Sequence, residues 1–178
     1  KDHIIYLLLL VLFLGNVLTQ IYLQRKGLDN QPVNDYNPAA SDAFGYVKRA
    51  ELVAKDGDFV NAFKDGFRPP GYPLFLSTFI HFSDRPLLGA RYAQIVLSAL
   101  TIILLFFALA NICKSKTEAL FGAFVFAFWA PLYYFSPMLG AESCSIFLFA
   151  LFIYLLSKIT GKSSLPIIYT LPVVLALL

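Results

Sequence analysis

Residues 4–23 read IIYLLLLVLFLGNVLTQIYL, an apolar run without a charged side chain. One helix needs about 20 apolar residues to cross the hydrocarbon core of a bilayer, so this run suffices for one crossing. A cleavable signal peptide would have a shorter apolar stretch followed by small residues. Here Gln24, Arg25 and Lys26 follow instead, which favours a retained transmembrane helix.

The composition of the whole chain also indicates a membrane protein. Of its 178 residues, 58% are hydrophobic and 14% are charged, and the mean hydropathy is +0.69. Soluble domains are closer to about 45–50% apolar and about 25% charged. The formal net charge of only +3, with no long basic run, argues against a nucleic-acid partner.

Further apolar runs predict an all-α integral membrane fold, with several transmembrane helices and a polar outer loop between the first two. The last run starts near Leu165 and is too short to span, so we expect the N-terminal part of a larger polytopic protein, inactive as a fragment. The predicted segments are transmembrane helices at 1–23, 89–113, 117–136 and 141–158, a loop at 24–88, and the start of a truncated fifth helix at 165–178.

Basic residues predict which side of the membrane each segment faces. If every span crosses once, Lys1, the turn at 114–116 and the turn at 158–162 share one side and all carry lysine. The other short turn, 136–141, has no Lys or Arg. By the positive-inside rule the N-terminus is cytoplasmic and the loop 24–88 is extracytoplasmic. The family resemblance described below adds the expectation of a multi-pass plasma-membrane protein.

The loop is expected to contain two short helices. Ser41 is a candidate N-cap, apolar residues follow it at helical spacing, and Gly57 is a plausible stop. This pattern indicates an amphipathic helix lying on the membrane surface or, equally, a half-buried helix of a loop domain. Residues 72–82 are apolar but too few to span, so they should be interfacial or re-entrant.

Four ionisable residues from separate segments fall at the predicted outer face: Asp42, Arg68, Arg91 and Glu142. Charges near a bilayer are costly unless paired or hydrated, so they either share a polar site or are separate solvated helix ends. Asp42 lies in the first turn of its helix, where the dipole favours a carboxylate. It could act as a general base or only stabilise the helix start.

The string Arg68-Pro69-Pro70-Gly71-Tyr72-Pro73 is the most specific motif. Its prolines restrict the backbone, and Gly71 permits a turn or a close approach. The segment would hold a guanidinium, whose donors match a phosphate, at the headgroup level; the alternative is a structural turn with a snorkelling arginine. Arg91 is either an interfacial anchor or a ligand for phosphate or carboxylate. Glu142 could pair with an arginine, bind a cation or contact a sugar.

The order of these motifs resembles the N-terminal part of the GT-C glycosyltransferases. The nearest groups are the protein O-mannosyltransferase-like and aminoarabinose-transferase-like enzymes, and the resemblance covers about residues 4–160. It is carried by Ser41-Asp42-Ala43-Phe44-Gly45-Tyr46, by Arg68-Pro69-Pro70-Gly71-Tyr72-Pro73-Leu74-Phe75, and by the second span that Arg91 opens.

The resemblance implies a membrane enzyme that moves a sugar from a polyprenyl-phosphate donor to a protein, lipid or glycan acceptor. It implies that Asp42 is the catalytic base and that Arg68 touches the lipid phosphate, and Tyr46 matches a tyrosine of the aminoarabinose-transferase pattern. Two positions depart from the family: Ala43 replaces an acidic residue and Gly45 an arginine, which weakens the case for a paired-carboxylate mechanism.

Arg91, Tyr46, Tyr72 and Glu142 complete the predicted site for the lipid phosphate and substrate. No metal ligands are assigned, because the two histidines are isolated; a divalent cation at Asp42 and Glu142 stays open. The alternative function is a non-enzymatic polyprenyl-phosphate-binding or transport protein. Charged residues are absent from the centres of the predicted spans, which argues against transport.

Overall fold

The structure is a computed structural model that describes residues 2–29, 41–136 and 138–159. Every regular element within these residues is a helix, so the predicted all-α class is confirmed. The elements are α1 (Asp2–Asp29), α2 (Ser41–Glu51), the π-helix η1 (Leu52–Asp56), α3 (Phe59–Phe63), α4 (Gly71–Phe82), α5 (Pro86–Cys113), α6 (Lys116–Ala127), α7 (Ala130–Phe135) and α8 (Glu142–Ser157).

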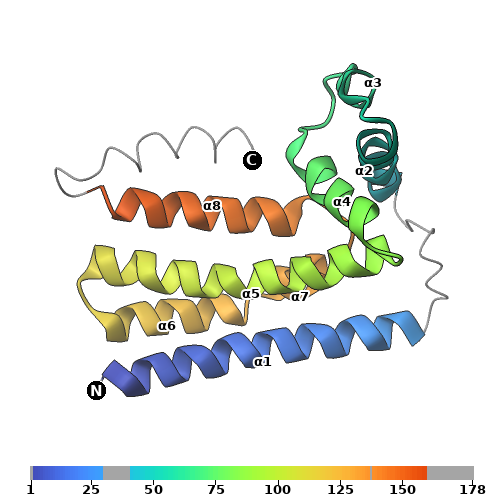
Figure 1. The fold of residues 1–178 in the computed structure, drawn as a ribbon. Coiled ribbons are helices and arrows are strands. Elements are labelled where there is room, and N and C mark those ends of the chain that lie inside the picture. Colours follow the sequence, from blue (N-terminus) through green and yellow to red (C-terminus); the bar gives the residue numbers. More distant parts are fainter. Residues whose placement is uncertain (1, 30–40, 137, 160–178) are drawn as a thin grey trace.

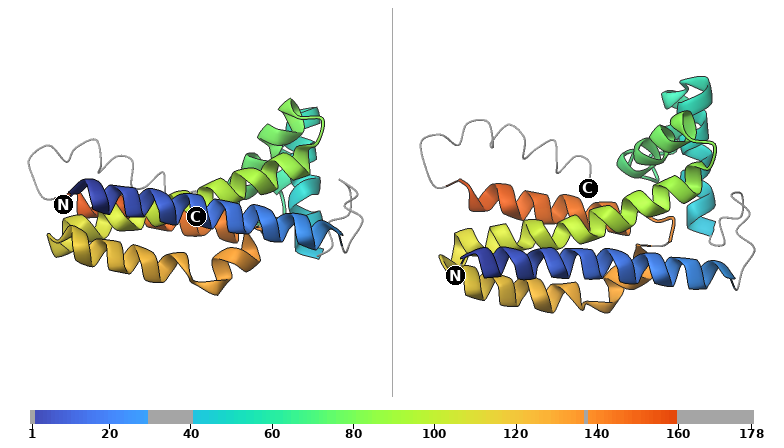
Figure 2. Two further views of the ribbon diagram at one scale, coloured as in Figure 1. Left: turned by 90° about the horizontal axis from the view of Figure 1, so that it is seen from below. Right: turned by 60° about the horizontal axis from the view of Figure 1, so that its bottom comes forward.

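Four helices, α1, α5, α6 and α8, lie side by side in a bundle (Figure 1). α5 is its centre and contacts each of the other three. The helices from α2 to α4, residues 41–82, form a separate group at the end of the bundle where α5 begins (Figure 2). We call this group the loop cluster. It is joined to the bundle mainly through contacts of α4 with α5.

Two helices are long and apolar enough to cross a membrane, at Asp2–Lys26 and Pro86–Cys113. They suggest membrane association. α8 is apolar but shorter, and the run predicted at 165–178 lies outside the described residues. The multi-pass topology therefore stays a prediction.

The helix predicted over 117–136 is interrupted, because α6 ends at Ala127 and α7 starts at Ala130. Pro131 explains the break. In a continuous helix the N–H of residue 131 would bond the carbonyl of Ala127, and proline has no N–H. The freed carbonyl instead accepts a hydrogen bond from the Tyr133 hydroxyl at 2.6 Å and from Asn16 Nδ2 at 3.3 Å.

Asn16 belongs to a row of buried amide side chains on α1, which also form other hydrogen bonds. Asn16, Gln20 and Gln24 recur every fourth residue, and their exposed fractions are 3%, 0% and 4%. Gln20 Nε2 donates to Asn16 Oδ1 and, at 3.1 Å, to Ser98 Oγ on α5. In an apolar setting such hydrogen bonds fix the relative positions of helices.

Within the loop cluster, α2 runs on into η1 and ends at Gly57, whose φ of 63° is left-handed. The predicted stop at Gly57 is therefore confirmed, because this backbone conformation favours glycine. Ser41, predicted as the N-cap, is the first residue of α2 itself. An ion pair between Arg49 and Asp65 ties α2 to the segment that leads into Arg68.

Candidate functional site: an arginine beside an apolar pocket

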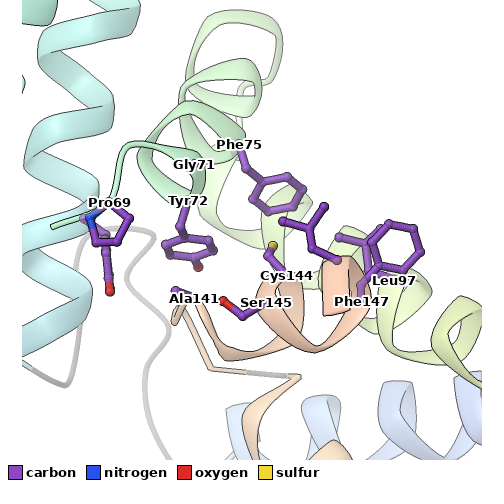
Figure 3. A pocket seen from close by; sticks show the side chains of 11 residues that line it. Pro69, Gly71, Tyr72, Phe75, Leu97, Ala141, Cys144, Ser145 and Phe147 are labelled. Carbon is purple, nitrogen blue, oxygen red and sulfur yellow. The ribbon is translucent and has the colours of Figure 1, made fainter. Parts of the chain in front are cut away.

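A pocket of about 300 Å³ lies where the loop cluster meets α5 and α8. Figure 3 shows Tyr72 and Phe75 on the α4 side and Cys144 and Phe147 on the α8 side. Apart from a few polar atoms its walls are apolar side chains. The lining residues are Tyr46, Pro69, Gly71, Tyr72, Phe75, Leu97, Ala141, Cys144, Ser145, Phe147 and Leu148.

Arg68 lies next to this pocket, directly before Pro69. Its guanidinium carbon is 4.4 Å from the centroid of the Tyr46 ring, which is cation–π geometry. A Cβ atom at Gly45 would be 3.0 Å from Arg68 Nε. The guanidinium therefore occupies the space that a side chain at position 45 would need, and glycine at this position leaves room for Arg68.

Tyr46 and Tyr72 connect the arginine to the pocket wall. Their rings meet edge to face with centroids 4.9 Å apart, and Tyr72 stacks on Phe75 at 5.9 Å. The Tyr72 hydroxyl donates to Gln94 Oε1 at 3.0 Å. Tyr72 thus contributes its ring to the pocket, while its hydroxyl is bonded on the side of α5.

Four ionisable side chains act on the Tyr72 hydroxyl, and two of them, Glu142 and Arg91, carry a charge. Burial raises the pKa of the Tyr72 hydroxyl; Cys144, Glu142 and Tyr46 act in the same direction and Arg91 opposes them. Arg91 lies one helical turn before Gln94 on α5 and is half-buried, whereas Glu142 starts α8 and is exposed. The structure therefore brings five of the predicted site residues into one region: Arg68, Arg91, Tyr46, Tyr72 and Glu142.

The sixth residue, Asp42, is the second residue of α2. It precedes Tyr46 by one helical turn, a spacing that places two residues on the same face of a helix. Its side chain lies outside the described part of the chain, so its role as a base stays a prediction.

Sequence reasoning missed the α8 wall of the pocket and the glutamine that bonds Tyr72. Ala141, Cys144 and Phe147 were part of an apolar span with no reason to single them out. Gln94 is one of two amides in its apolar run, with Asn111 near the other end, and its polarity was the one signal that could have identified it.

Among the described residues, no group of three or more His, Cys, Asp or Glu side chains could hold a metal ion. Both cysteines are free. A cation bound by Glu142 with residues outside this part of the chain stays a prediction.

Comparisons with protein-family models, with curated proteins and with solved structures found no match to this chain. The resemblance to GT-C glycosyltransferases therefore rests on the sequence motifs.

Proposed function

We propose that this chain is the donor-binding part of a membrane glycosyltransferase that transfers a sugar from a polyprenyl phosphate to an acceptor on the extracytoplasmic face of the plasma membrane. The observation that carries the proposal is a guanidinium that lies on the Tyr46 ring, in space left by Gly45, beside an apolar pocket of about 300 Å³. An amphiphile with an anionic head and a hydrocarbon tail is complementary to that combination.

In the proposed reaction, Asp42 removes a proton from a hydroxyl or amine of the acceptor. The acceptor atom forms a bond to the anomeric carbon of the sugar, and the bond from that carbon to the phosphate oxygen breaks with inversion. The electron pair goes to the phosphate, where Arg68 and Arg91 stabilise the developing charge. A protein, lipid or glycan can each supply the acceptor group.

The second candidate is a non-enzymatic polyprenyl-phosphate-binding or transport protein. Arg68 and the pocket favour it as much as they favour the enzyme, because binding requires only those two features. Chemistry at Asp42 separates the two functions.

The test uses the full-length protein in native membranes, supplied with radiolabelled polyprenyl-phosphate sugars. The Asp42→Asn variant should stop the transfer of label, and the matched control Asp56→Asn, an exposed acid of the same loop, should not. Arg68→Ala should weaken donor binding, and Arg85→Ala, at an exposed arginine, should leave it unchanged.

Donor binding without transfer in the wild type would favour the non-enzymatic candidate. Full transfer by a well-expressed Asp42→Asn protein would exclude Asp42 as the base. Donor binding that is insensitive to Arg68→Ala would remove the support that the pocket gives to both candidates.

A further inference from the structure

Gln94 is a fully buried glutamine that joins three parts of the molecule around the pocket. Its exposed fraction is 0%. Its Oε1 accepts from the Tyr72 hydroxyl on α4, and its Nε2 donates to the backbone carbonyl of Met138 at 2.9 Å and of Gly140 at 3.3 Å. The amide group thus uses both its donor and its acceptor side.

The turn that Gln94 holds leads directly into the opposite wall of the pocket. Ala141 follows Gly140 and lines the pocket, and the Glu142 carboxylate occupies the space that a Cβ atom at residue 140 would need. The Tyr72 ring lines the other side. One buried side chain therefore bonds to Tyr72 in one wall and to the turn that leads into the other wall.

We propose that Gln94 is a positioning residue that sets the separation between the Tyr72 ring and the start of α8, and so the width of the pocket at this end. A carboxylate could accept from Tyr72 but has no N–H for the two carbonyls, and an apolar side chain could do neither. Only an amide satisfies all three partners. Any effect of Gln94 on lipid binding rests on the proposed function, whereas its effect on the width of the pocket does not.

The width can be measured without a ligand, because Cys144 lines the pocket. The experiment uses the full-length protein in native membranes with Cys144 as its sole cysteine, and follows the rate of its alkylation by N-ethylmaleimide. Loss of buried hydrogen bonds favours local opening, so Gln94→Met should raise the rate about 5- to 10-fold. Gln94→Glu keeps the acceptor for Tyr72 but places a buried carboxylate against the two carbonyl oxygens, so it should also raise the rate.

The matched control is Gln20→Met, which removes another fully buried glutamine that joins two helices but does not line this pocket. It should lower the thermal stability in the same way and leave the Cys144 rate unchanged. An unchanged rate in folded Gln94→Met and Gln94→Glu proteins, or an equal increase in Gln20→Met, would overturn the proposal.

A second arm separates this inference from the proposed function. Farnesyl phosphate should protect Cys144 of the wild type from alkylation more than farnesol does, and Gln94→Met should reduce that difference. If farnesyl phosphate gives no protection but Gln94→Met still accelerates alkylation, the proposed function fails and the positioning role of Gln94 stands.

Discussion

At the scale of single residues, the position of the Arg68 side chain depends more on residues that contact it in space than on the prolines that follow it in the sequence. The Pro-Pro motif restricts the backbone, but the guanidinium lies on the face of Tyr46 and against Gly45. A guanidinium fixed in advance binds a phosphate with less loss of side-chain entropy than a mobile one. Tyr46 and Gly45 should therefore affect phosphate binding without touching the phosphate.

We expect Tyr46→Leu to weaken the binding of farnesyl phosphate by about 2- to 30-fold, the equivalent of about 0.5–2 kcal/mol for one cation–π contact. Tyr46→Phe keeps the aromatic face and should retain most of the affinity. Equilibrium binding to the purified full-length protein measures both. Equal losses in the two variants would instead implicate the Tyr46 hydroxyl.

For Tyr46 and Tyr72, the sequence predicted a place in the site but not the hydrogen-bond partner of Tyr72. Both tyrosines were predicted to bind substrate, and both rings line the pocket. The Tyr72 hydroxyl donates to Gln94, which is 22 residues away in a different helix. This hydrogen bond could not be predicted, because hydrogen bonds between helices leave no local pattern in the sequence.

At the scale of elements, the break between α6 and α7 is linked to the buried amides of α1 by a hydrogen bond. Pro131 frees the carbonyl of Ala127, and Asn16 is one of the two groups that satisfy it. Inside an apolar bundle an unsatisfied carbonyl is costly. The apolar pattern of 117–136 predicted one helix because it carries no information about a hydrogen bond supplied by α1.

We predict that Asn16→Leu lowers the free energy of unfolding by about 0.5–1.5 kcal/mol, the net contribution of a typical hydrogen bond, because Tyr133 still donates to the Ala127 carbonyl. In a Pro131→Ala background the N–H of residue 131 can bond Ala127, so the same substitution should cost less. A double-mutant cycle measured by unfolding in mixed micelles tests this coupling. Strict additivity would mean that Asn16 stabilises the bundle independently of the break.

The short helix α3 was not predicted, because five residues are too few for a periodic pattern to be recognised. Its start is fixed by Asp58, whose carboxylate accepts from the Asn61 backbone N–H at 3.0 Å and from the Asn61 side chain at 2.6 Å. These hydrogen bonds hold the pKa of Asp58 below its ordinary value of 3.8. The ionised form is therefore the one that caps the helix.

Because this pKa is lowered in the folded state, the cap is fully stabilising above the ordinary value of 3.8 and is lost as the pH falls through the lowered value. We expect the protection of the Asn61 amide against hydrogen exchange, corrected for the intrinsic rate, to decline on acidification in that range. In Asp58→Asn the amide oxygen can still accept, so this decline should be absent. A decline of the same size in the variant would assign the effect to another carboxylate.

At the scale of the whole molecule, the proposed function requires the loop cluster to be outside the cell. α5 has 28 residues, a length of about 42 Å at 1.5 Å per residue. This exceeds the roughly 30 Å of a hydrocarbon core, so a membrane-crossing α5 has its ends on opposite sides. The start of α5 is next to the loop cluster, and Cys113 is at its other end.

A membrane-impermeant thiol reagent applied to intact cells tests this arrangement. In variants of the full-length protein with a single cysteine, Asp84→Cys, at an exposed position before α5, should be labelled from outside. Cys113, which is also exposed, should be labelled only after permeabilisation. The reverse pattern would place Arg68 and the pocket in the cytoplasm, where the predicted donor-binding face could not be. Labelling of both cysteines from one side would mean that α5 does not cross the membrane.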